Sequence, residues 1–388
     1  MTVKNLLKSS FYLLILALLA SCKQEPETPV DSFTVSGTVK GLDTKYMSRS
    51  VRDSTGKRVT DTIFVKNGTF TYTAKIKNAE HIVFWPNVER TIKRSGKGYY
   101  PAKSSQLAFI AKPGDHIVFK GEVTDFINAY PSGTKANDDL AKINSKIFPL
   151  MNASVNYLLK KNKLTSEDPR FKIITDSITQ LDKEVIRLKK EFVDNNPTSE
   201  AAVWSLSDMM VRRQISNEEA VVAFNKFDKN LADFTYYKEL ASRVKGIAST
   251  LIGKTVPDFT SNKTIDGSDF TFSSLRGKYV LIDFWGIWCG PCVEEMPIVK
   301  KYADKYADKL TILGINSGDT KEKMVNFLKE NNYNWQQVMS GKGTDNLVLK
   351  FNVAGFPTKF IINPEGKILN RYLGNSEDAF IKLDELLK

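Results

Sequence analysis

Residues 279–285 read YVLIDFW, an almost unbroken apolar run with the length of one β-strand. Such runs are typical of strands covered on both faces, whereas half-exposed strands alternate apolar and polar residues. A similar run follows at 310–315, and strands at 358–362 and 368–369 flank the turn sequence NPEG of a hairpin. Helical patterns are expected at residues 292–306, 320–331, 343–351 and 376–387. The chain is therefore predicted to end in an α/β domain, over residues 251–388, with helices on both faces of the sheet.

Residues 33–130 have an all-β pattern of short alternating segments. Asn67-Gly68 lies between two of these segments, and Asn-Gly is the strongest short-range hairpin signal. Pro113-Gly114 supplies the turn chemistry for a second expected hairpin. This part of the chain is predicted to be a small antiparallel β-sandwich or barrel.

Residues 131–250 change to a helical pattern. Apolar side chains are spaced by four and three residues from Ile174 to Phe192, which predicts one long amphipathic helix. Further helices are expected at 199–212, 217–229 and 235–248. The apolar stripe fits either a dimeric coiled coil or a helical bundle, and its short length favours the bundle. We expect a helical spacer domain without chemistry of its own.

The first 21 residues have the pattern of a secretory signal. Lys4 and Lys8 precede an apolar run at residues 11–20, which is shorter than the ~20 residues of a membrane-spanning helix. The run ends in LASC, which resembles the lipobox of bacterial lipoproteins and implies cleavage before Cys22 and lipidation of that residue. An uncleaved anchor or a plain signal peptide is the alternative. Residues 22–32 read as a polar tether, so the protein is expected in the cell envelope, lipid-anchored and periplasm-facing, on a membrane that the sequence does not specify.

Composition excludes several classes of function. The chain has 388 residues, only 3 cysteines and a net charge of +12. The charge is compatible with an anionic partner, but no Arg-rich stripe interleaved with aromatics is present, so no nucleic-acid partner is expected. The two histidines, His81 and His116, are too few for a His-rich metal site, and each precedes Ile-Val in a predicted strand, where we expect it on the surface. No metal and no cofactor are expected.

Cys289 and Cys292 carry the chemistry. They stand in WCGPC at residues 288–292, where the strand ending at Trp285 passes into a helix. A thiolate is the nucleophile of thiol-disulfide exchange, and the unpaired N–H groups of a helix start favour negative charge on Cys289. Cys292 lies one turn further on, in the position to resolve a mixed disulfide. Two cysteines without two further ligands do not complete a zinc site.

The residues around this pair resemble the thioredoxin family. DFWGI at 283–287 followed by WCGPC is similar to thioredoxin, and VPDF at 256–259 with LRGK at 275–278 is similar to its membrane-anchored TlpA/ResA-type branch. The likeness covers residues 252–388. The preceding β and helical parts resemble, less specifically, the N-terminal extension of some bacterial lipoproteins of this kind.

The resemblance implies a protein-disulfide oxidoreductase with a set of supporting residues. Asp283 matches the buried acid that accepts a proton from the second cysteine, and its alternative is a backbone-capping role. Glu295 matches an acid of the TlpA/ResA-type group, and its alternative is a solvated helix residue; which of the two acids moves the proton stays open. Phe356-Pro357 matches the cis-proline loop that, with Trp288, is expected to form the substrate-binding surface.

The leading hypothesis is an exported reductant of disulfides. Its expected partners are exported proteins with Cys pairs, apocytochrome c among them, a membrane thiol-transfer protein as electron donor, and the membrane through the lipid on Cys22. One alternative is a thiol peroxidase, which requires a Thr three residues before the attacking cysteine, where Gly286 stands. Another is a non-enzymic envelope lipoprotein whose β and helical domains bind a partner.

Overall fold

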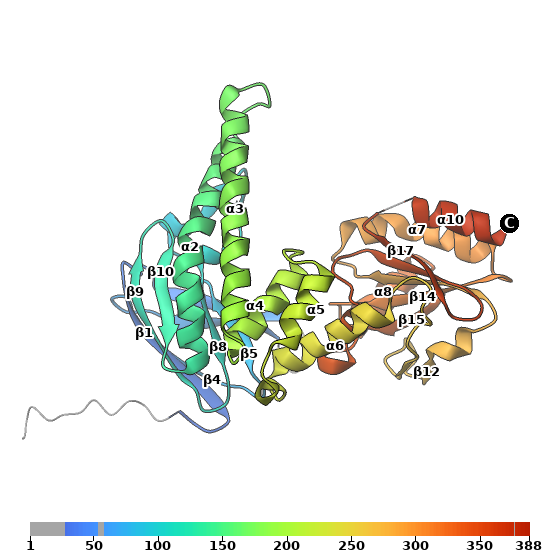
Figure 1. Ribbon diagram of the computed structural model, residues 1–388, viewed down its shortest axis with the longest axis horizontal. Helices are drawn as coiled ribbons and strands as arrows, with labels where there is room; N and C mark the ends of the chain where they lie inside the picture. The colour runs from blue at the N-terminus through green and yellow to red at the C-terminus, as the bar shows by residue number, and fades with distance from the viewer. Residues whose placement is uncertain (1–27, 53–57, 376) are drawn as a thin grey trace, which may run out of the picture.

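The computed structural model describes residues 28–52, 58–375 and 377–388. A β-rich domain, a group of helices and a C-terminal α/β domain follow one another along the long axis of the molecule (Figure 1). This order confirms the predicted multidomain architecture, while the domain boundaries at residues 130 and 250 stay predictions. The predicted signal sequence and Cys22 lie outside the described residues. Within the described ranges, no helix is long and apolar enough to cross a bilayer.

The β-rich domain is a two-layered sandwich with an aromatic core. One sheet has the strand order β10-β9-β1-β4; β5 pairs with β8, and a bridge from Ser48 to Trp85 joins β2 to the end of β5. Phe33, Phe84, Phe109 and Phe119 are fully buried and pack tilted or edge-on in the core. The strands are β1 (Ser32–Lys40), β2 (Tyr46–Arg52), β3 (Arg58–Phe64), β4 (Thr69–Lys75), β5 (Glu80–Phe84), β6 (Lys93–Ser95), β7 (Gly98–Tyr100), β8 (Leu107–Ala111), β9 (His116–Val123) and β10 (Ile127–Ser132).

The two hairpins predicted within residues 33–130 exist only as turns. Asn67 and Gly68 both have positive φ, as a tight hairpin turn requires, but β3 pairs with β2 whereas β4 pairs with β1. Similarly, β8 pairs with β5, and β9 pairs with β10 and, in parallel, with β1. The hairpin predictions are therefore wrong beyond the turns, because consecutive strands at a sandwich corner pass into different sheets. The parallel β1–β9 pair is a further departure from a purely antiparallel sandwich.

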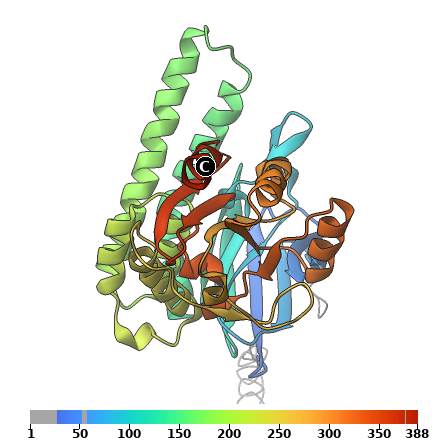
Figure 2. The ribbon, with the colours of Figure 1, turned by 90° about the vertical axis from the view of Figure 1, so that its right-hand side faces the viewer.

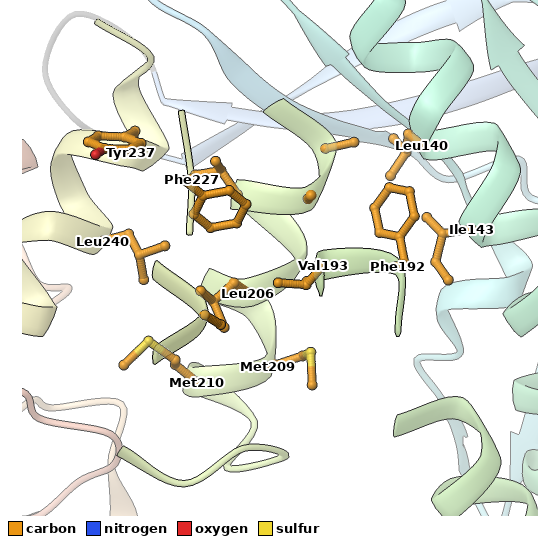
Figure 3. Packing of buried hydrophobic residues seen from close by; sticks show 14 of the residues in the cluster. Leu140, Ile143, Phe192, Val193, Leu206, Met209, Met210, Phe227, Tyr237 and Leu240 are labelled. Atoms are coloured by element: carbon orange, nitrogen blue, oxygen red, sulfur yellow. The ribbon is translucent and has the colours of Figure 1, made fainter. Parts of the chain in front are cut away.

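The helical segment begins directly after β10. Thr134, Asp168, Ser199 and Ser216 each cap a helix start by accepting a backbone N–H. Val185, Leu188 and Phe192, the C-terminal half of the apolar stripe predicted on α3, belong to the cluster formed with α2 and α4, part of which Figure 3 shows. The far part of the α2–α3 hairpin projects beyond the rest of the molecule (Figures 1 and 2). The helices are α2 (Lys135–Lys161), α3 (Pro169–Asn195), α4 (Glu200–Val211), α5 (Asn217–Asn225) and α6 (Thr235–Ser249).

The C-terminal domain confirms the α/β prediction. Its sheet has the order β15-β14-β13-β16-β17. Strands β13, β14 and β15 are parallel to one another, β16 is antiparallel to β13, and β17 is antiparallel to β16. Side chains of α7, α8 and α10 are buried on one face of the sheet, and side chains of α9 and residues 256–272 on the other. The elements are β11 (Thr260–Ser261), β12 (Phe270–Thr271), β13 (Tyr279–Trp285), α7 (Gly290–Lys305), β14 (Leu310–Asn316), α8 (Lys321–Glu330), β15 (Gln336–Met339), α9 (Leu347–Lys350), β16 (Thr358–Ile362), β17 (Ile368–Leu373) and α10 (Asp378–Leu387).

Helix α6 joins the helical segment to the C-terminal domain. A Cβ atom built on Gly246 would lie 2.6 Å from the carbonyl oxygens of Leu349 and Lys350, so only glycine permits this approach. Beside it, the buried Arg243 donates to the carbonyl of Val353 at 3.2 Å. The helical segment is thus packed against the chain that leads into residues 354–357.

Replacing Gly246 with valine is expected to destabilise this junction by about 1–3 kcal/mol, the usual cost of overpacking. The added side chain meets backbone oxygens, which cannot move away as a flexible side chain does. Denaturant unfolding of the purified protein measures the effect. Valine has a higher helix propensity than glycine, so helix propensity alone would make Gly246→Val slightly stabilising. Ala248→Val, at an exposed position of the same helix, shows what a valine costs there without backbone contact, and an equal or larger loss in Ala248→Val would contradict the prediction.

Candidate active site

The cysteine pair lies at the start of α7. Cys289 is the N-cap residue and forms a disulfide with Cys292, whose backbone N–H donates to the Cys289 sulfur at 3.3 Å. Pro291 occupies the first turn, where a missing N–H leaves no helical bond unmade. Cys289 is 5% and Cys292 2% exposed. After reduction, the amide groups at this helix start favour the thiolate form of Cys289.

An aromatic surface lies beside the cysteine pair. The peptide bond between Phe356 and Pro357 is cis, as predicted. The Phe356 ring meets the Trp288 ring edge-on with centroids 5.1 Å apart, and Trp288 is 58% exposed. The Trp288 indole N–H donates to the carbonyl of Ser317 at 2.7 Å, which fixes the ring. Two loops that are distant in sequence therefore present aromatic side chains together next to the disulfide.

A buried group of three charges lies on the same side of the sheet as the cysteines. Asp283 in β13 is opposite Lys359 in β16, with the Asp283 Oδ1 and Lys359 Nζ atoms 3.6 Å apart. Lys359 also forms an ion pair with Glu295, which follows Cys292 by three residues on α7. All three side chains are at most 5% exposed. Because strand residues alternate between faces, Asp283 shares its face with Leu281 and Trp285, which pack in the same cluster as Cys292.

The charges in this group do not balance when both acids are ionised. Burial raises the pKa of the Asp283 carboxyl; the Lys359 ammonium opposes this shift and the Glu295 charge adds to it. Burial of Asp283 outweighs the attraction of Lys359, so the Asp283 carboxyl takes up a proton more readily than an exposed aspartate does. The structure therefore brings together both acids that the sequence singled out and gives them different environments.

Lys359 was not among the residues expected at the site. It is a single charged residue in an otherwise apolar strand, and it lies two positions after the cis-proline. A charged side chain in a fully buried strand requires an opposite charge, so its pattern alone indicates a buried partner. Naming that partner needs the register between β13 and β16, which local sequence does not provide.

Gly286 has no room for a side chain. A Cβ atom there would contact the Trp288 indole and lie 2.8 Å from the carbonyl oxygen of Ser317. The threonine that a thiol peroxidase needs at this place is absent, and the packing of Trp288 leaves no space for it. Among the described residues, no group of three or more His, Cys, Asp or Glu side chains is placed to hold a metal ion.

The fold and the cysteine pair define a thioredoxin-like thiol-disulfide oxidoreductase. Residues 251–387 match the Redoxin family, and residues 33–140 match a domain of unknown function, DUF4369. Thiol-disulfide oxidoreductase ResA of Bacillus subtilis (strain 168) is 32% identical over 150 residues, which are 38% of this chain and 80% of that protein. Thioredoxin-like protein YneN of the same organism is 34% identical over 125 residues, 31% of this chain and 71% of that one.

Among solved structures, a thiol-disulfide oxidoreductase from Bacteroides fragilis NCTC 9343 is 28% identical, with a TM-score of 0.32, and the match covers 34% of this chain and 100% of that one. On the similarity to ResA, the chain belongs to the family of thiol-disulfide oxidoreductases that carry a Redoxin domain. The Redoxin match over residues 251–387 agrees with the extent of the resemblance found in the sequence.

Proposed function

We propose that this protein is an exported, lipid-anchored reductant of protein disulfides in the cell envelope, with apocytochrome c among its substrates. The observation that carries the redox part is the Cys289–Cys292 disulfide at a helix start, beside the aromatic surface of Trp288, Phe356 and the cis-Pro357. The signal-like residues 1–21 and LASC support export and a lipid on Cys22. A membrane thiol-transfer protein is the proposed electron donor.

In the first step, the Cys289 thiolate attacks one sulfur of the substrate disulfide. That S–S bond breaks, a mixed disulfide forms on Cys289, and the other substrate sulfur leaves and takes a proton from water. The backbone beside a cis-proline has an open edge, to which an extended substrate segment can add by main-chain hydrogen bonds. Trp288 and Phe356 cover the apolar side chains of that segment.

In the second step, Cys292 releases the substrate. Its thiol gives a proton to the Asp283 carboxylate, and its sulfur attacks the Cys289 sulfur, so the mixed disulfide breaks and the protein disulfide forms. Asp283 then returns the proton to the departing substrate sulfur. A carboxyl whose pKa is raised by burial is a stronger base than an exposed one, which suits it to this transfer. Glu295 and Lys359 hold Asp283 in this environment as positioning residues.

Asp283→Asn is expected to slow substrate release by roughly 10²-fold, the usual worth of a positioned acid–base group. The decay of the mixed disulfide after rapid mixing measures this step. Glu294→Gln, an exposed neighbour of Glu295, is the matched control and should leave the rate unchanged. A release rate in Asp283→Asn equal to that of Glu294→Gln would assign the proton to another group.

The same variant is expected to be more stable than the wild type at neutral pH. The folded Asp283 keeps its proton at pH values where the unfolded residue, with its ordinary pKa of 3.8, has lost it. Folding stability therefore falls as pH rises from the ordinary value through the raised one, and asparagine removes this loss. Denaturant unfolding at acidic and neutral pH tests the sign, and a variant less stable than wild type at neutral pH would contradict it.

A redox titration of the Cys289–Cys292 pair tests the proposed direction of electron flow. A reductant should have a potential near that of thioredoxin, about −270 mV, whereas a potential near that of DsbA, about −120 mV, would identify an oxidant. The anchor is tested separately, since mass spectrometry of the mature protein should find a lipidated Cys22 at the N-terminus. An unmodified residue would refute the anchor and leave the redox proposal standing.

A further inference from the structure

A cavity lies between the β-rich domain and the helices, away from the cysteine pair. Its volume is about 270 Å³, room for about nine water molecules at liquid density. This is slightly below the usual range of ligand pockets, about 300–1,000 Å³, so an occupant would be small. Strand β5, residues 103–108, and helices α2, α3 and α4 all contribute to the lining.

Three cations at this cavity share one carboxylate. The Asp208 carboxylate forms ion pairs with Lys103, Lys189 and Arg212, with N···O distances of 2.8, 3.0 and 3.0 Å. Within the described ranges, none of the three cations has a second carboxylate partner, so the group carries two positive charges in excess. Lys189 is 4% exposed, and burial lowers the pKa of Lys103 to about 8.

The remaining lining is largely apolar and aromatic. The ring of His81 stacks on Trp204 with centroids 3.9 Å apart and planes within 12°, and Lys103 lies over the same indole at 5.2 Å. His81 is thus not the freely exposed strand residue that its sequence context predicted. Burial lowers its pKa to about 3, so it is neutral and adds no charge. Phe148 adds a further aromatic surface.

Asn144 is a polar residue of α2 that lines the cavity. It is 5% exposed, and its side-chain amide offers both a hydrogen-bond donor and an acceptor. A carboxylate in the cavity can accept from this amide while lying near the three cations.

We propose that this cavity binds a small organic carboxylate with an aromatic or aliphatic body. The carboxylate compensates the charge excess at Lys103, Lys189 and Arg212 and accepts from Asn144, and the apolar body packs against Trp204 and Phe148. The site is separate from the redox reaction, since its residues belong to the β-rich and helical parts of the chain.

The test uses 4-fluorobenzoate and the neutral 4-fluorobenzamide as probes, followed by ¹⁹F NMR on the purified protein. The carboxylate is expected to bind with a Kd of about 1 mM or tighter, and the amide at least about tenfold more weakly. Lys103→Met, which leaves Lys189 and Arg212 on Asp208, should weaken carboxylate binding at least about tenfold. Lys112→Met is the matched control, because Lys112 pairs with Glu200 outside the cavity, and should bind as the wild type does.

Asn144→Asp gives a second test of carboxylate binding that does not depend on the lysine variant. It keeps the shape of the side chain but adds a negative charge, so carboxylate binding should be lost while the thermal transition is retained. The proposal is overturned if 4-fluorobenzoate and 4-fluorobenzamide bind equally, if Lys103→Met and Asn144→Asp both bind like the wild type, or if 4-fluorobenzoate fails to bind at about 10 mM.

Discussion

Replacing Cys289 with serine is expected to reduce disulfide reduction by the protein to the background rate of the electron donor alone. Serine is nearly isosteric with cysteine, but its hydroxyl does not ionise near neutral pH and does not form a disulfide. The fold should be unaffected, because Cys289 remains an N-cap position, which serine occupies well. Reduction of a small protein disulfide, followed by the appearance of free thiols, measures the effect.

Cys292→Ser gives the complementary result. Cys289 can still attack, but the residue that breaks the mixed disulfide is missing, so the substrate should stay bound to Cys289. Non-reducing gels of cell extracts should show bands that disappear on reduction, and their partners can be identified by mass spectrometry. The double variant is the control, since it lacks the attacking sulfur. Bands of equal intensity in the double variant would mean that Cys289 is not the attacking residue.

The sequence predicted the redox centre because its signals are local. The strand 279–285, the turn and the start of α7 follow one another directly, and WCGPC carries its chemistry within five residues. The acids Asp283 and Glu295 follow from the resemblance to the thioredoxin family, because each stands at a fixed short distance in sequence from the cysteines. Both features depend on short-range geometry, which is the part of a fold that sequence patterns specify most directly.

The features that the sequence did not predict depend on contacts between distant segments. The β-strands at the Asn67-Gly68 turn were recognised, but their partners come from elsewhere in the sandwich. His81 precedes Ile-Val in a predicted strand, which favours a position on the surface, but Trp204, on a helix more than a hundred residues later, stacks on its ring. The place of Lys359 at the site was not predicted for the same reason, because it depends on ion pairs with Asp283 and Glu295, which belong to other elements.

The approach of α6 to the cis-proline loop is a further feature of this kind. Arg243 is 4% exposed and reaches the carbonyl of Val353, four residues before Pro357. Nothing in the local pattern of α6 distinguishes Arg243 from a solvated helix residue. The helical segment, expected as a spacer, thus contacts the segment that leads to the proposed substrate surface, which gives it a structural role in the C-terminal domain.

Lys359→Met is expected to lower the free energy of unfolding by about 3–5 kcal/mol at neutral pH, the typical cost of removing one partner from a buried ion pair. Two carboxyls would then share a site in which each is at most 5% exposed, without a cation. Lys300→Met, which removes an exposed-face pair with Asp304 on α7, is the matched control and should cost less than about 1 kcal/mol.

The pH dependence of this loss separates charge from packing. Lys359 opposes the rise in the pKa of Asp283, so its removal raises that pKa further. The folded variant then binds a proton that the unfolded chain has released, and its stability falls as pH rises above the ordinary value of 3.8. The deficit should therefore be small in acid and largest at neutral pH, and Lys359→Met combined with Glu295→Gln should recover most of it, because one buried charge has been removed with its partner. A deficit that is constant with pH and persists in the double variant would mean that Lys359 acts through its packing alone, and that the buried charges do not set the protonation of Asp283.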